Sequence, residues 1–132
     1  MRTKVRSVVV RKLPESISGV QREQVYNDLE SSINVDRPAV VLDCSAVQRF
    51  DRSAIHLLLC CLEEAMKRNG DIRLAGLTSQ ALGDLKSAEV DSLFHRFASL
   101  GEAIDSFHRP QFDFIQIDKP MQDGEKSRMN AA

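Results

Sequence analysis

The sequence predicts an α/β fold in which a mostly parallel sheet of four to five strands is covered by about four helices. Short apolar segments alternate along the chain with amphipathic segments of about ten to fifteen residues, as in consecutive β–α units. The segment PAVVLDC at 38–44 is an apolar run, which is typical of a strand that is covered on both faces. A chain of 132 residues also has the length of a single domain.

The first half of the chain contains signals for two strands and two helices. Residues 5–13 are rich in valine and stop before a proline, which predicts a strand. Residues 19–33 place apolar side chains on one side of a helix. The run at 38–44 is the second strand, and a long apolar helix is expected from Ser53 to Gly70, where glycine is a common terminator.

The second half repeats this alternation with weaker elements. Residues 71–77 form a predicted strand, after which Thr78 is placed to cap a helix. The segment 92–97 is a weak strand. Ser99 and Glu102 have the spacing of a capping box, which predicts a last helix.

The regular pattern fades after this helix. Residues 111–117, QFDFIQI, alternate in part and would suit an added strand. The residues that follow are polar and contain glycine and proline. We therefore expect one domain at 1–109 and a partly disordered C-terminal extension at 110–132.

Composition narrows the class of protein. With 42% apolar and 28% charged residues, the chain is expected to be globular and cytoplasmic, and its net charge of -1 argues against nucleic acid as the main partner. It contains no run of about eighteen apolar residues, so no membrane span is expected. Three cysteines fit a reducing compartment better than a disulfide framework. Cys60 and Cys61 are expected to pack as small hydrophobic side chains.

The loop at 44–52 joins a strand to the long helix, and Ser53 stands at its end. In α/β folds functional groups gather at the carboxyl ends of strands. On a helical wheel of about 100° per residue, Ser53 lies beside a polar stripe, which predicts that its hydroxyl faces solvent. The stripe contains His56, Glu63, Glu64 and Lys67. The opposite side contains Ala54, Leu58, Cys61, Leu62 and Ala65, widened by Ile55, Leu59 and Met66.

Ser53 has two interpretations. A helix N-terminus has free N–H groups and partial positive charge, so it could receive a phosphate on Ser53, which would add about -1.5 to -2 charges. Arg52 would partly offset this charge and Asp51 would oppose it. Alternatively, these residues serve only to begin the helix, with Asp51 or Ser53 as the cap. Periodicity alone leaves both interpretations open.

The segment VVLDCSAVQRFDRSAIHLLL resembles the central part of a STAS domain, the module of bacterial anti-sigma factor antagonists. In that family a strand ending in Leu-Asp leads through a loop to an Asp-Ser-Ser-Gly-Leu-type motif that opens a long helix. Here Leu42 and Asp43 close the strand, and residues 51–55, DRSAI, take the place of the motif. The later helix end at Asn-Gly, the strand DIRLAGL and the helix GEAIDSF match the order of elements in the family, so the resemblance spans 5–107.

The resemblance implies a STAS-like fold and a switch rather than an enzyme. It implies that Ser53 is phosphorylated by a partner anti-sigma factor, which is also a serine kinase with a histidine-kinase-like ATPase fold. A serine phosphatase would reset the cycle, and self-association stays open. The partner-binding surface would comprise Asp51, Arg52, Ser53, Ala54, His56 and Glu63. Arg52 and Ala54 depart from the Ser or Thr and the Gly that are usual in the family.

Two other functions are weighed against this switch. A STAS scaffold that is never phosphorylated would assemble a signalling or transport complex through its helix faces. An enzyme has little support, because the chain has no phosphate-binding loop, nucleophile elbow or C-x-x-C pair. His56, His95 and His108 are widely spaced, so no metal or cofactor is expected. A receiver domain with Asp43 as phosphoacceptor would need an early acidic pair for magnesium, which is absent after the first strand.

Overall fold

The computed structural model describes residues 7–17 and 19–108, whose strands run parallel in one sheet of order β1-β2-β3-β4. The strands are β1 (Val9–Lys12), β2 (Ala39–Asp43), β3 (Asp71–Ala75) and β4 (His95–Phe97). The helices are α1 (Val20–Ile33), α2 (Arg52–Lys67), α3 (Ser79–Ser87) and α4 (Leu100–His108), with a short helix η1 (Asp91–Leu93) before β4. The predicted α/β class, with a parallel sheet and about four helices, is confirmed.

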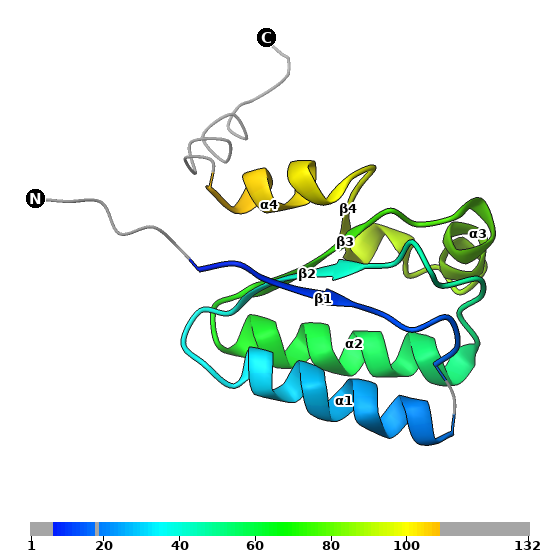
Figure 1. Cartoon of the computed structure of the whole chain (residues 1–132), viewed down its shortest axis with the longest axis horizontal. Coiled ribbons are helices and arrows are strands. Elements are labelled where there is room, and N and C mark those ends of the chain that lie inside the picture. Colours follow the sequence, from blue (N-terminus) through cyan, green and yellow to red (C-terminus); the bar gives the residue numbers. More distant parts are fainter. Residues whose placement is uncertain (1–6, 18, 109–132) are drawn as a thin grey trace, which may run out of the picture.

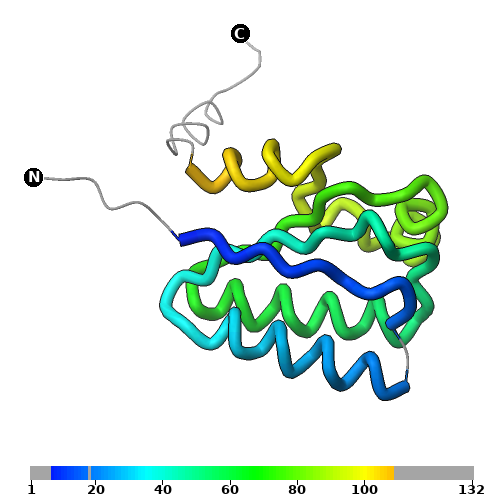
Figure 2. Tube along the Cα trace, in the orientation of Figure 1, coloured from blue at the N-terminus to red at the C-terminus, as the bar shows by residue number. Residues whose placement is uncertain are grey.

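The helices cover both faces of the sheet. Helices α1 and α2 lie side by side on one face, and α4 crosses the opposite face (Figure 1). Figure 2 shows the chain passing from β1 to β3 through α1 and α2, and then returning across the other face as α4. Within the residues that the structure describes, no helix combines the length and the apolar character that a membrane span requires.

Strand β2 is buried on both faces, as its apolar sequence predicts. Val40 and Leu42 belong to the cluster formed with α1 and α2, whereas Ala39 and Val41 pack with α4. None of these four side chains is more than 3% exposed. Burying a valine or leucine side chain contributes about 1.5 to 3 kcal/mol, so this strand is a large part of the stability of the sheet.

All four strands are shorter than the predicted segments, and β1 and β4 differ most from them. Within the described residues β1 begins at Val9, and residues 5 and 6 lie outside them. In the segment 92–97 only the last three residues pair with β3. Leu93 lies in η1 and is 56% exposed, so its apolar side chain does not belong to a strand core. The expected strand at 111–117 and the extension at 110–132 fall outside the described residues.

The predicted helix caps form. The Oγ1 atom of Thr78 accepts a hydrogen bond from the amide of Ala81 at 3.1 Å. The Oγ atom of Ser99 accepts one from the amide of Glu102 at 3.2 Å, which is the serine half of the predicted capping box. Each bond satisfies an amide that the first turn of a helix leaves unpaired.

The turn after α2 brings the helix end against the start of β2. Asn69, with φ 64°, takes the left-handed conformation, and the amide of Gly70 donates to the carbonyl of Ala65 at 2.8 Å. The amide of Asp71 then donates to the carbonyl of Pro38 at 2.9 Å. Glycine is needed at position 70 for space, because a Cβ atom there would overlap the carbonyl and the ring of Pro38.

We expect Gly70→Ala to lower the free energy of unfolding by about 1 to 3 kcal/mol, because the backbone of Pro38 must move to admit the methyl group. Gly83→Ala is the matched control. Gly83 lies inside α3 with open space at its Cβ position, so that substitution should raise stability by up to about 1 kcal/mol. Urea unfolding curves of both variants measure the two effects, and equal stabilities would contradict the role assigned to Gly70.

Candidate functional site

The loop between β2 and α2 is held down by its own buried side chains. Cys44 and Val47 are 0% exposed and Phe50 is 3% exposed. The amide of Cys44 donates to the carbonyl of Ala75 at 2.9 Å, and the carbonyl of Val47 accepts from the hydroxyl of Thr78 at 3.3 Å. The loop is therefore fastened at both of these points to the end of β3 and the start of α3.

Asp43 closes β2 and shapes the first turn of this loop. Its Oδ1 atom accepts a hydrogen bond from the amide of Ser45 at 3.0 Å. This bond, with a further one from the Ser45 side chain, lowers the pKa of the Asp43 carboxyl below its ordinary value. A carboxylate that is fixed in this way holds the turn.

Asp84 of α3 fastens the end of the loop. Its carboxylate accepts two hydrogen bonds from the guanidinium of Arg49, both at 2.9 Å, and one from the amide of Phe50 at 2.8 Å. The hydrogen bond from Arg49 is the main cause that lowers the pKa of Asp84. We call these three residues the Asp84 latch. The latch fixes the backbone immediately before α2.

Asp51 is the cap of α2. It has extended backbone angles, and its Oδ1 atom accepts a hydrogen bond from the amide of Ala54 at 2.8 Å. Ser53 is the second residue of the helix, and its side chain is exposed. Of the two candidates for the cap, the structure therefore selects Asp51, and the Ser53 hydroxyl is not used to begin the helix.

Ala54 lies in the third position of α2, with its side chain 1% exposed and packed in the core. It has no positive φ, so the helix does not need the glycine that the family usually has here. The departure from the family pattern is therefore compatible with the fold, and the Ala54 side chain does not reach the surface.

The polar stripe of α2 is exposed and is wider than expected. We define the α2 polar strip as Ser53, His56, Cys60, Glu63, Glu64 and Lys67, all exposed. Cys60 was expected to be packed, but it lies one turn beyond His56, and its Sγ atom is 3.5 Å from Nε2 of that histidine. Cys61, about 100° further round the helix, is buried as expected, and burial raises the pKa of its thiol to about 11.

Met66 is a second side chain of α2 whose burial was predicted wrongly. It was expected to widen the apolar side of α2, but it is 60% exposed. The core contacts of α2 are made instead by Ala54, Leu57, Leu58, Cys61, Leu62 and Ala65. Met66 lies about 100° from Ala65, beyond the sector that packs against the sheet and α1.

A groove of about 510 Å³ separates the strip from α1, and most of its lining is polar. Its walls include Tyr26 and Glu30 of α1, together with Cys60, Glu63 and Glu64 of α2. The charge of Glu30 is the first cause that raises the pKa of Tyr26. The strip therefore adjoins an acidic depression on one side.

At the start of α2 the site presents an exposed serine hydroxyl, that of Ser53. Among the described residues no base is hydrogen-bonded to the Ser53 hydroxyl, and His56 pairs instead with Cys60. Across residues 7–17 and 19–108, no three His, Cys, Asp or Glu side chains gather as metal ligands. Asp51 and Arg52, the two residues before Ser53, are exposed and are the nearest charges in sequence.

We expect Asp84→Asn to lower the free energy of unfolding by about 1 to 2 kcal/mol at pH 7, because the Phe50 amide and the Arg49 guanidinium lose a charged acceptor. The pKa of Asp84 is lowered by folding, so its contribution is present above the unfolded pKa, about 3.9, and is lost as the pH falls through the folded value. Urea unfolding from pH 7 to pH 3 should therefore show the gap between wild type and variant closing below about pH 4.

Asp105→Asn is the control for the latch, since Asp105 is an exposed carboxylate on α4. That change should shift stability by less than about 0.5 kcal/mol. A gap between wild type and Asp84→Asn that stays constant down to pH 3 would contradict the assigned role of the Asp84 carboxylate.

Solved structures with the same fold include an anti-sigma-factor antagonist domain protein and proteins of transporter families. An anti-sigma-factor antagonist (STAS) domain protein from Planctomyces limnophilus has a TM-score of 0.69 at 19% identity, covering 76% of this chain and 90% of its own. The STAS domain of a SulP transporter from Vibrio cholerae has a TM-score of 0.63 at 15% identity, covering 88% of each chain. A sulfate transporter family protein from Wolinella succinogenes has a TM-score of 0.61 at 18% identity, covering 76% of this chain and 84% of its own.

Comparison of the sequence with known proteins and families identifies the family of this chain. No curated protein sequence matches this chain significantly. At the identities given above, the structural similarities establish the fold alone. The family model for the STAS domain, however, matches residues 1–103, which is well over half of the chain. This protein therefore belongs to the STAS domain family.

Proposed function

We propose that this STAS domain is a regulatory binding protein of the anti-sigma factor antagonist type, switched by phosphorylation of Ser53. The observation that carries the proposal is the division of roles at the start of α2. Asp51 supplies the cap, which leaves the neighbouring Ser53 hydroxyl exposed in the first helical turn. A kinase can therefore modify Ser53 without removing a hydrogen bond on which the helix depends.

The proposed modification changes the charge next to a loop that tertiary contacts hold in place. The Asp84 latch and the buried side chains of Val47 and Phe50 hold the loop before Ser53. A phosphate would add about -1.5 to -2 charges at the positive end of the helix dipole, where an anion stabilises the helix by about 0.3 to 1 kcal/mol. The fold would therefore tolerate the phosphate, and its effect would fall on the affinity for a partner.

The proposed partner is an anti-sigma factor that is also a serine kinase with a histidine-kinase-like ATPase fold. Its docking surface would run from Asp51 and Arg52 through Ser53 to His56 and Glu63 on the α2 polar strip, all exposed. Ala54 contributes to this surface only through its place in the backbone, because its side chain is buried. A serine phosphatase would restore the unmodified form.

A second candidate function is a STAS scaffold that is never phosphorylated. Arg52 favours it, because this exposed cation occupies the position beside the acceptor where the family usually has Ser or Thr. Two of the structurally similar proteins are described as belonging to transporter families, so the fold itself suits either function. Under this alternative the helix faces bind a partner constitutively.

We expect the purified protein, incubated with ATP and its cognate serine kinase, to gain the mass of a single phosphate. Ser53→Ala should gain none. Ser79→Ala is the matched control and should be modified like wild type, because Ser79 is also an exposed serine in the first turn of a helix. Intact-mass spectrometry with each serine kinase of this type from the source organism measures the result. Stable complexes with no phosphate on any of them would favour the scaffold.

We expect Ser53→Asp to weaken binding to that kinase by about tenfold or more, because a negative charge then faces the docking surface. Ser79→Asp places the same charge at the start of α3 and should leave the affinity unchanged. Calorimetric titration of the unmodified variants gives both dissociation constants. Equal affinities for wild type and Ser53→Asp would count against the switch and for the scaffold.

A further inference from the structure

Strand β1 has one side that is unpaired in the described part of the chain. It pairs only with β2, and the amide of Leu13 donates to the carbonyl of Asp43 at 3.0 Å. Since successive residues of a strand direct their N–H groups to opposite sides, the amides of Val10 and Lys12 point away from β2. An edge of this kind is a template for a further strand.

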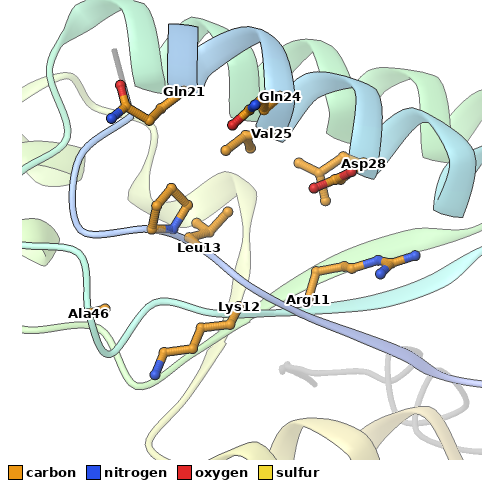
Figure 3. A pocket seen from close by; sticks show the side chains of 10 residues that line it. Arg11, Lys12, Leu13, Gln21, Gln24, Val25, Asp28 and Ala46 are labelled. Carbon is orange, nitrogen blue, oxygen red and sulfur yellow. The ribbon is translucent and has the colours of Figure 1, made fainter. Parts of the chain in front are cut away.

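Space for side chains lies along this edge. Two grooves that share Arg11 lie between β1 and α1, with volumes of about 610 and 400 Å³. Figure 3 shows Leu13 pointing toward Val25 of α1 in the second groove, whereas Lys12 points away from α1. On the α4 face of the sheet Val10 is 40% exposed, so both faces have apolar surface beside the edge.

Helix α4 delivers the chain to the start of this edge. It follows β4, at the opposite edge of the sheet, and contacts β4, β3 and β2. Phe107 near its end shares a cluster with Val41 of β2, and Val8, which immediately precedes β1, packs against that cluster. Residues 108–110 would join Phe107 to the segment 111–117, and three residues span at most about 10 Å.

We propose that residues 111–117 add to the sheet as a fifth strand, beside β1 and parallel to it. The crossover from β4 through α4 to this strand would be right-handed, as is usual between parallel strands. Helices α1 and α2 lead from β1 toward β3 on one face, and α4 leads back on the other, so a parallel strand reached through α4 gives a crossover of the same hand as β1–α1–β2.

The side chains of 111–117 match the two faces of the edge. Asp113 and Ile115 alternate with Phe112 and Phe114 in the sequence. With Asp113 beside Arg11, Ile115 lies beside Leu13 in the groove toward α1. Phe112 and Phe114 then cover Val10 on the α4 face. This pairing places opposite charges together and buries apolar surface on both sides.

Hydrogen exchange of individual β1 amides in the full-length protein tests the proposal. In wild type the outward amides of Val10 and Lys12 should exchange slowly, like the inward amides of Val9 and Arg11. Phe114→Pro and Ile115→Pro are compared because one of these two residues must donate toward β1 in either register. The variant that places proline at the donating residue should accelerate exchange at Val10 and Lys12 by about tenfold or more. Exchange at Val9 and Arg11 should be unchanged.

Met121→Pro is the control, since it places a proline outside the segment and should leave all four amides as in wild type. Protected inward amides show in each variant that the domain is folded, independently of the state of Ser53. Fast exchange of Val10 and Lys12 in wild type would overturn the proposal. Protection that survives both proline variants, or that rises with protein concentration, would assign the edge to a second copy of the chain and would overturn it equally.

Discussion

The burial of β2 on both faces is the constraint on which the rest of the structure depends. Its side chains alternate between the cluster with α1 and α2 and the cluster with α4, so neither layer of helices can be removed without exposing this strand. Because β2 is also parallel to both of its neighbours, its carboxyl end and theirs meet at one edge of the sheet. The loop that leaves β2 must emerge there, and it carries Ser53 to the surface on a support that the whole core holds in place.

Local sequence signals were sufficient wherever the physical cause is local. The apolar run of β2, the caps at Thr78 and Ser99, and the exposed side of α2 each depend on residues within a few positions of one another. The Asp84 latch could not be predicted, because it joins residues that are 34 and 35 positions apart and either partner alone reads as an ordinary surface charge. Cys60 was misplaced for a different reason: its apolar character outweighed its position one turn beyond His56. The helical wheel itself places Cys60 on the polar stripe, where the structure has it.

The separation of cap and acceptor explains how a helix start can hold a regulatory residue at little structural cost. If Ser53 were the cap, a phosphate would displace the hydrogen bond that begins α2, and modification would be coupled to fraying of the first turn. With Asp51 as the cap and Ala54 packed beneath it, the first turn is held from both sides while the intervening hydroxyl faces solvent. The same arrangement explains why the glycine that is usual in the family is dispensable here, since position 54 is already helical and its methyl group fills a place in the core.

The α2 polar strip and the edge of β1 are two surfaces that involve different parts of the chain. Ser53 and the α2 polar strip follow the end of β2, whereas the proposed strand beside β1 would follow the end of α4. A strand that binds at that edge gains its stability from backbone hydrogen bonds and from the grooves beside α1, and none of the residues that line those two grooves belongs to α2. A phosphate on Ser53 would therefore change the charge of the docking surface without loosening the edge. Closing the edge would in turn stabilise the sheet that holds the acceptor in position.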